Sequence, residues 1–302
     1  MPILSVQNLH KHYGPVHALK GVSFDVPAGS VFGILGPNGS GKTTLLGIMM
    51  DIIKPTSGTF QLFDETPSAK LRSQIGTLLE TPNFYHYLTA VQNLRIAAKI
   101  KGRGEADVER VLGMVDLLAR KNSRFSTYSL GMKQRLAVAS CLLGNPEVLV
   151  FDEPTNGLDP VGIAETRELI KKLNKEGKTI IMASHMLDEV EKVCTHVAIL
   201  QKGVLISNGH VDEILVNEDI VEISSKNLET LSRKVQQLPG ATHVKINQQY
   251  VEVFFPSGEA MLENINQYCF EKGEVLNHLR LRRKSLETKF FELTQTNNTQ
   301  KK

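Results

Sequence analysis

Three glycines, a lysine and a threonine lie close together near the N-terminus at a spacing suited to binding phosphate. The run Gly36-Pro37-Asn38-Gly39-Ser40-Gly41-Lys42-Thr43 matches the pattern G-x-x-x-x-G-K-[ST]. Its glycines let backbone N–H groups turn toward an anion without Cβ clashes. Lys42 would reach the β- and γ-phosphates of a nucleotide, and the Thr43 hydroxyl would bind Mg²⁺. The pattern therefore predicts a loop that holds a nucleoside triphosphate.

An apolar stretch that ends in two acids could supply the remaining chemistry. The run Val148-Leu149-Val150-Phe151 is followed directly by Asp152 and Glu153. Asp152, at the end of a buried strand, could position Mg²⁺ at the phosphate loop. Glu153 could face the γ-phosphate and polarise an attacking water. The alternative is a strand that ends in a solvated acidic turn, and the phosphate-binding pattern upstream favours the chemical interpretation.

Both motifs need strands and helices that place them together. Residues 31–35 and 178–183 are apolar runs typical of buried strands, and residues 44–50 predict a helix directly after the phosphate loop. The N-terminus of that helix adds partial positive charge where phosphate would bind. Residues 1–30 predict antiparallel strands and turns. Residues 85–145 have helical spacing of apolar residues and predict a helical subdomain inserted into an α/β domain.

A second, smaller domain is predicted after a polar segment at residues 217–219. Strand-like and helix-like segments alternate from 220 to 294, which indicates a small α+β domain. Within it, residues 279–284 form a basic run that could bind lipid headgroups or nucleic acid. The favoured alternative is a strand with Leu279 and Leu281 inward and the arginines in solvent. We therefore predict domains at 1–215 and 220–294, a helix start near 285, and a disordered tail at 295–302.

Composition limits the class of protein. The chain has 302 residues, of which 41% are apolar and 22% charged, as in ordinary globular proteins. The net charge of +3 is too small to indicate nucleic acid as a partner. Cys141, Cys194 and Cys269 lack metal-ligand spacing, so we expect reduced core thiols in a cytoplasmic protein. No run of 18 apolar residues occurs, so we expect neither a transmembrane helix nor a signal peptide.

Three further segments resemble those of one family. Residues 128–136 (YSLGMKQRL) resemble the signature motif of ABC-type ATPases, residues 156–160 (NGLDP) resemble their D-loop, and Ser184-His185 resembles their switch histidine. The segments occur in the family's order, and the resemblance covers residues 1 to about 215. The chain thus resembles the nucleotide-binding subunit of an ABC transporter. The resemblance implies an α/β P-loop NTPase fold, with an inserted helical subdomain and an N-terminal antiparallel β subdomain, that hydrolyses ATP with Mg²⁺.

The resemblance also implies how ATP is bound. Two subunits would enclose two ATP molecules head to tail, with Ser129 and the Gly131 N–H contacting the γ-phosphate across the interface. His185 would hydrogen-bond the same phosphate, and Asp159 would contact the opposite subunit. Tyr13 would stack on adenine, its alternative being an ordinary surface tyrosine in a turn. The implied nucleotide-binding residues are Tyr13, Gly36, Pro37, Asn38, Gly39, Ser40, Gly41, Lys42, Thr43, Thr44, Ser129, Gly131 and Asp159.

Two positions depart from the family's common pattern. The signature has Leu130 and Met132 where Gly and Gln are common, although Ser129 and Gly131 are retained. Glu80 replaces a glutamine that usually binds Mg²⁺ and contacts the membrane partner. A carboxylate can ligate Mg²⁺ but cannot donate a hydrogen bond as an amide does, and it could alter the pKa of nearby Glu153. With a glutamate at this position, the chain resembles the subunits that export peptide antibiotics or give immunity to them. The alternative is that Glu80 is a neutral variant.

The implied function is an ATPase that powers an exporter of drugs, peptides or lipids. Its expected partners are an integral membrane permease on a separate chain and a second ATPase subunit, identical or paralogous, without nucleic acid. Its expected location is the cytoplasmic face of the membrane. A soluble ABC ATPase acting on nucleic acid or ribosomes usually has two ATPase units or a marked basic surface, which this sequence lacks. A regulatory module without turnover would not need Lys42, Asp152, Glu153 and His185.

Overall fold

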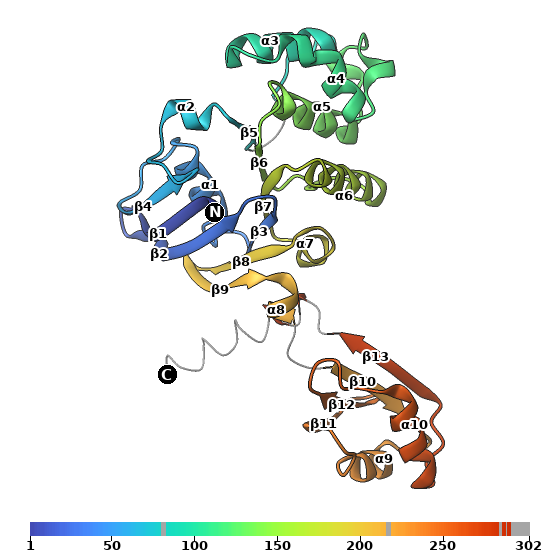
Figure 1. Cartoon of the computed structure of the whole chain (residues 1–302). Coiled ribbons are helices and arrows are strands. Elements are labelled where there is room, and N and C mark those ends of the chain that lie inside the picture. The colour runs from blue at the N-terminus through green and yellow to red at the C-terminus, as the bar shows by residue number, and fades with distance from the viewer. Residues whose placement is uncertain (80–82, 216–218, 284–285, 288, 291–302) are drawn as a thin grey trace. The chain divides into compact units, whose positions relative to one another are not determined.

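The computed structural model describes residues 1–79, 83–215, 219–283, 286, 287, 289 and 290. The chain divides into two compact units, Met1–His210 and Val211–Lys302 (Figure 1). The boundary expected from the sequence, residue 215, falls slightly later, at the end of helix α8 (Val211–Leu215). Glu80, the tail 295–302 and most of the segment 285–294 lie outside the described residues.

A six-stranded sheet forms the centre of the first unit (Figure 1). Its strand order is β5-β6-β7-β3-β8-β9, and all neighbours are parallel except β8 and β9. The strands are β3 (Val31–Leu35), β5 (Ile75–Leu78), β6 (Val148–Asp152), β7 (Thr179–Ser184), β8 (His196–Gln201) and β9 (Val204–His210). Every residue of β3, β6 and β7 is buried, which explains their continuous apolar runs. Because these three parallel strands are neighbours, the segments that follow them meet at one edge of the sheet.

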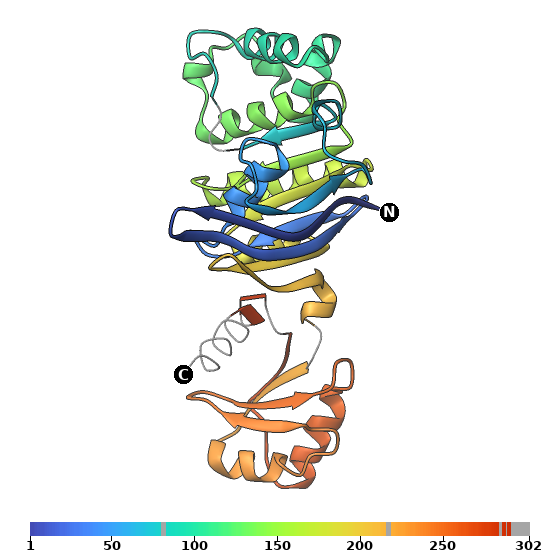
Figure 2. The ribbon, with the colours of Figure 1, turned by 90° about the vertical axis from the view of Figure 1, so that its left-hand side faces the viewer.

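A three-stranded antiparallel sheet, with order β2-β1-β4, packs on the same core. Its strands are β1 (Pro2–Tyr13), β2 (Val16–Pro27) and β4 (Ser57–Leu62), and the first two form the long hairpin drawn in dark blue in Figure 2. Alternating residues such as Leu4, Val6 and Val22 point inward and share one hydrophobic cluster with Phe32 and Leu45. The hairpin is therefore fixed to the strand and helix that flank the phosphate loop.

Helices complete the first unit. The helices connected to the sheets are α1 (Lys42–Met49), α2 (Ala69–Arg72), α6 (Pro160–Lys175) and α7 (Leu187–Val193). The segment between β5 and β6 contains α3 (Ala90–Lys101), η1 (Glu105–Asp107), α4 (Val108–Met114), η2 (Leu118–Arg120), η3 (Phe125–Thr127) and α5 (Leu130–Leu142). A capping box of Thr89 and Gln92 starts α3, and Gly102 ends it in the left-handed conformation. No helix within the described ranges is long and apolar enough to cross a membrane.

In the second unit, the described residues 219–283 form an antiparallel sheet and two helices in the order βαββαβ, a split-βαβ arrangement. Its strands lie in the order β11-β12-β10-β13. The elements are β10 (Asp219–Ser224), α9 (Leu228–Val235), β11 (His243–Ile246), β12 (Val251–Phe255), α10 (Leu262–Glu271) and β13 (His278–Arg283). Val221, Val253, Leu231 and Ile265 meet in a core of its own, which closes between the sheet and the helices.

Strand β13 differs from its sequence-based expectation at two residues. Leu279 packs against the core as expected, but Leu281 is 38% exposed. Arg282 is not simply solvated: its Nη1 donates to Glu222 Oε1 at 3.0 Å and lies 3.8 Å from Glu252 Oε1. The basic run thus contributes to ion pairs within the sheet, which accounts for part of its charge without a nucleic acid or lipid partner.

Candidate functional site

The loop between β3 and α1 is shaped by glycines in close contact with the core. Gly36 is buried with φ 157°, and a Cβ at this position would lie 2.3 Å from the Leu200 carbonyl oxygen. Gly41 begins α1 with φ 107°, and a Cβ there would lie 2.6 Å from the Ala18 carbonyl oxygen. Gly39, with φ 76°, has open space around it. The loop is therefore held tightly on its core side and open on the other, as a cradle for an anion requires.

Lys42 is buried inside this loop. Its ammonium group donates to the carbonyl oxygens of Gly36 at 2.8 Å and Pro37 at 3.3 Å. The same Nζ lies 3.4 Å from Glu153 Oε1, and Lys42 is only 5% exposed. A buried ammonium needs such partners, and phosphate oxygens could replace them.

The acid and the histidine predicted from the sequence lie side by side. Glu153 Oε2 is 2.9 Å from His185 Nδ1, and Asp152 is buried at the end of β6. Glu153 adopts φ 50°, which is uncommon for a residue with a Cβ and recurs at functional sites. Its backbone N–H donates to the Ala183 carbonyl at 3.0 Å, which fixes the turn after β6 against β7. Lys42, Glu153 and His185 thus form one polar cluster at the edge of the sheet.

An open groove of about 610 Å³ runs from this cluster to the tip of the β1–β2 hairpin. Of the predicted residues, it is lined by Tyr13, Asn38, Gly39, Gly41, Lys42, Thr43, Thr44 and Glu153. Tyr13 is 46% exposed, and Lys11 Nζ lies 4.9 Å from the centre of its ring. The groove therefore offers an aromatic face at one end and a phosphate cradle at the other.

The groove also has lining residues that the sequence did not indicate: Val16, His17, Ala18, Lys20 and Lys202. They come from strand β2 and from the β8–β9 turn. The Gly203 N–H donates to the Ser40 carbonyl at 3.0 Å, and the Lys20 N–H donates to the Gly203 carbonyl at 2.8 Å. These contacts join segments that are far apart in the chain, so no local sequence pattern indicates them.

Ser129, Gly131 and Asp159 are not among the lining residues of the groove. Ser129 is exposed and caps α5, its hydroxyl accepting from the Met132 N–H at 3.3 Å. Asp159 is exposed and caps α6, its Oδ1 accepting from the Gly162 N–H at 3.0 Å. Both caps present a helix N-terminus at the surface. Glu80, the remaining predicted site residue, lies outside the described residues.

Known proteins are similar to this chain in sequence and in fold. The sequence profile of the family described as ABC transporter matches residues 19–156. The chain is 40% identical over 217 residues to the bacitracin transport ATP-binding protein BcrA of Enterococcus faecalis, covering 70% of each. It is 37% identical over 210 residues to the lantibiotic transport ATP-binding protein SrtF of Streptococcus pyogenes, covering 70% of this chain and 92% of that one. A solved dimer of the ATP-binding cassette MJ0796, bound to ADP and phosphate after hydrolysis, matches with a TM-score of 0.61 and 27% identity, covering 69% of this chain and 98% of that one.

The chain is a P-loop ATPase of the ABC type. This class is defined by the parallel sheet, the phosphate loop and the similarity of the chain to solved cassettes. The chain belongs to the ATP-binding proteins of ABC transporters. It is the ATP-binding subunit of such a transporter and a component of its complex.

Proposed function

We propose that this subunit powers the export of a peptide antibiotic or a similar amphipathic compound. The cargo class is supported by the relatives, which are named for bacitracin and lantibiotic transport. The observation that carries the chemistry is the cluster of Glu153, Lys42 and His185 at the open end of the phosphate cradle. Cargo selection would belong to a membrane subunit on another chain.

ATP would lie along the groove. Its adenine would stack on Tyr13, and its phosphates would accept from the N–H groups of residues 36–44 and from Lys42. Phosphate would replace the Gly36 and Pro37 carbonyls as the partner of Lys42, because an ammonium binds an anion more strongly than a neutral carbonyl.

Mg²⁺ fits the oxygen donors at this site. Thr43 lines the groove and Asp152 directly precedes Glu153, so these residues offer a hydroxyl and a carboxylate, the hard oxygen ligands that Mg²⁺ prefers. Glu80 is proposed as a third ligand. When bound, the ion would neutralise charge on the β- and γ-phosphates.

Hydrolysis would use Glu153 as the general base for water and His185 as a hydrogen-bond partner of the γ-phosphate. Their 2.9 Å contact supports the assignment, since one side chain orients the other. A carboxylate held this way can accept the proton of the attacking water while Lys42 stays on the phosphates.

Turnover would require a dimer. Ser129, Gly131 and Asp159 do not line the groove of their own chain, which supports a role across an interface with a second subunit, identical or paralogous. The helix N-terminus beyond Ser129 suits the γ-phosphate of the partner's ATP. The solved cassette MJ0796 is itself dimeric, which supports this requirement.

A membrane subunit would dock on the helical subdomain, which would hold the ATPase at the cytoplasmic face of the membrane. Residues of β5, α3 and α5 line a second groove of about 480 Å³ there. Tyr85, Tyr87 and Ile100 expose 52%, 69% and 82% of their surface beside or near it. An exposed apolar surface on a transporter subunit suits a helix from the membrane partner.

The first test replaces the proposed base. Glu153→Gln should lower ATP turnover by about 100-fold or more, because a general base contributes this much. ATP binding should remain, since the phosphate cradle is intact. Glu168→Gln, an exposed acid on α6, is the control and should keep normal turnover. Turnover that survives Glu153→Gln would show that another group is the base.

The second test identifies the partner. Tagged Glu153→Gln protein is purified with ATP and Mg²⁺ from detergent-solubilised membranes, and its partners are identified by mass spectrometry. Recovery of a polytopic membrane protein in fixed ratio is expected. Recovery of ribosomal proteins or nucleic acid instead would favour a soluble ABC ATPase that acts on those partners.

A further inference from the structure

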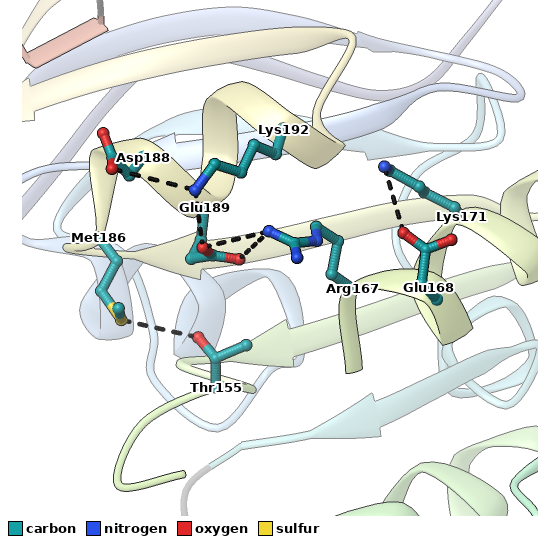
Figure 3. A network of polar contacts seen from close by, with 8 residues as sticks. All are labelled: Thr155, Arg167, Glu168, Lys171, Met186, Asp188, Glu189 and Lys192. Atoms are coloured by element: carbon teal, nitrogen blue, oxygen red, sulfur yellow. Dashed lines mark hydrogen bonds and ion pairs between the residues drawn. The ribbon is translucent and has the colours of Figure 1, made fainter. Parts of the chain in front are cut away.

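A buried carboxylate joins the two helices that follow the site (Figure 3). Glu189, on α7, is only 8% exposed. One guanidinium nitrogen of Arg167, on α6, lies 3.4 Å and 3.3 Å from the two Glu189 carboxylate oxygens. Lys192, one turn along α7, contacts Glu189 Oε1 at 3.3 Å. The carboxylate is thus held between a cation of its own helix and a cation of the neighbouring helix.

Such a contact can hold two helices in one arrangement while contributing little to the free energy of folding. A buried ion pair gives little net stabilisation over an apolar pair, but removing one partner leaves an uncompensated charge. The nearby pair Glu168–Lys171 shows the contrast in the same figure. Its carboxylate is 69% exposed and both residues lie on α6, so it joins nothing to α7. Glu189 therefore has a connecting role that Glu168 lacks.

The two joined helices begin at two proposed site residues. Helix α6 starts at its cap, Asp159, and α7 begins directly after His185 and Met186. A second contact joins the preceding turns, because Thr155 Oγ1 lies 3.9 Å from Met186 Sδ. Besides the direct contact of Glu153 with His185, two further contacts therefore join these parts of the chain, one between the turns and one between the helices that follow them.

We propose that Glu189 and Arg167 are positioning residues for ATP hydrolysis. They make α6 and α7 move together, so a displacement of Asp159 at the subunit interface is transmitted to His185 and its contact with Glu153. This inference rests on the proposed function, because it requires that His185 act on the γ-phosphate. Neither positioning residue touches the nucleotide groove.

The test measures steady-state ATP hydrolysis by the full-length chain over a range of ATP concentrations. Glu189→Gln should lower kcat by about 10- to 100-fold, the effect of a misplacement near 1 Å. KM for ATP should stay within about twofold, because Glu189 does not contribute to the binding of ATP in the ground state. Glu168→Gln, the matched control on α6, should change neither value. Arg167→Lys keeps the positive charge but replaces the Nη1 donor with an ammonium on a differently shaped side chain, and should lower kcat by a smaller factor.

A merely structural role is excluded by combining variants. If Glu189 acts through His185, the double variant Glu189→Gln/His185→Ala should have the kcat of His185→Ala alone. Circular dichroism and the shift of the unfolding temperature with ADP verify that each variant is folded and binds nucleotide. Independent effects that multiply in the double variant would overturn the inference, as would normal kcat for Glu189→Gln beside a deficient His185→Ala. Normal kcat for His185→Ala itself would instead refute the role proposed for His185, and the inference with it.

Discussion

The Glu153 carboxylate lies between an ammonium and an imidazole, 3.4 Å from Lys42 Nζ and 2.9 Å from His185 Nδ1. Lys42 approaches Oε1 and His185 contacts Oε2, so each carboxylate oxygen already has a nitrogen partner. We expect phosphate to draw Lys42 away, which would leave Glu153 oriented by His185 alone. The same three residues would thus be unreactive without nucleotide and ready for hydrolysis with it.

The three cysteines provide a prediction at the residue scale. Burial raises the pKa of the Cys141 thiol to about 12, and it is the largest cause of the raised pKa values of Cys194 and Cys269. The thiolate is the reactive form, so a raised pKa keeps the thiol neutral and inert at pH 8. Iodoacetamide at pH 8 should label none of the three in the folded protein and all three in urea, as read by intact-mass spectrometry. Labelling of native Cys141 at the rate of a free thiol would contradict this.

Contacts between elements explain how the helical subdomain is mounted on the sheet. Gly76 lies in β5, and a Cβ at this position would lie 2.3 Å from the carbonyl oxygen of Cys141 in α5. The close approach brings the helix capped by Ser129 directly onto the strand beside β6. The distance between α5 and the sheet thus depends on the absence of a side chain at Gly76.

Two glycine-to-alanine changes test this contact at the element scale. Gly76→Ala should destabilise the protein by about 1–3 kcal/mol, because backbone atoms of α5 must move. Gly113→Ala, in α4, meets nothing within 4 Å and should stabilise it by about 0.5–1 kcal/mol through helix propensity. Urea unfolding midpoints measure both. If Gly76→Ala raised the urea midpoint as much as Gly113→Ala does, the displacement of α5 would cost nothing, and the close contact of β5 with α5 would not limit their spacing.

The elements also show what the sequence could predict. The apolar runs of β3, β6 and β7 and the glycines of the phosphate loop are local patterns, so their structure could be derived from residue type and spacing. Contacts between distant residues could not, because periodicity carries no information on which strands become neighbours. Two such contacts between distant residues are the position of Lys20 and Lys202 together in the nucleotide groove and the Arg167–Glu189 pair. The roles of Ser129 and Asp159 came from family resemblance and stay predictions.

At the scale of the whole molecule, the chain contains two units with separate cores. One cluster gathers residues of the two sheets and α1, among them Leu4, Phe32 and Ile181. The other gathers residues of the second unit, among them Val221, Ile223 and Val253. A unit with its own core can unfold as a cooperative body. The nucleotide groove is lined entirely by residues of the first unit, so nucleotide should stabilise that unit selectively.

Calorimetry tests this independence. We expect two unfolding transitions. ADP and Mg²⁺ should raise the temperature of only one of them, because a ligand at 100 times its Kd adds about 2.7 kcal/mol to the free energy of unfolding of the unit that binds it. Ile181→Ala and Ile223→Ala are matched truncations of buried isoleucines in the first and second cores. Each should cost about 2–5 kcal/mol in its own transition and leave the other in place. If ADP or either substitution moved both transitions together, the two units would unfold as one body, and the second unit would be part of the ATPase core in energetic terms.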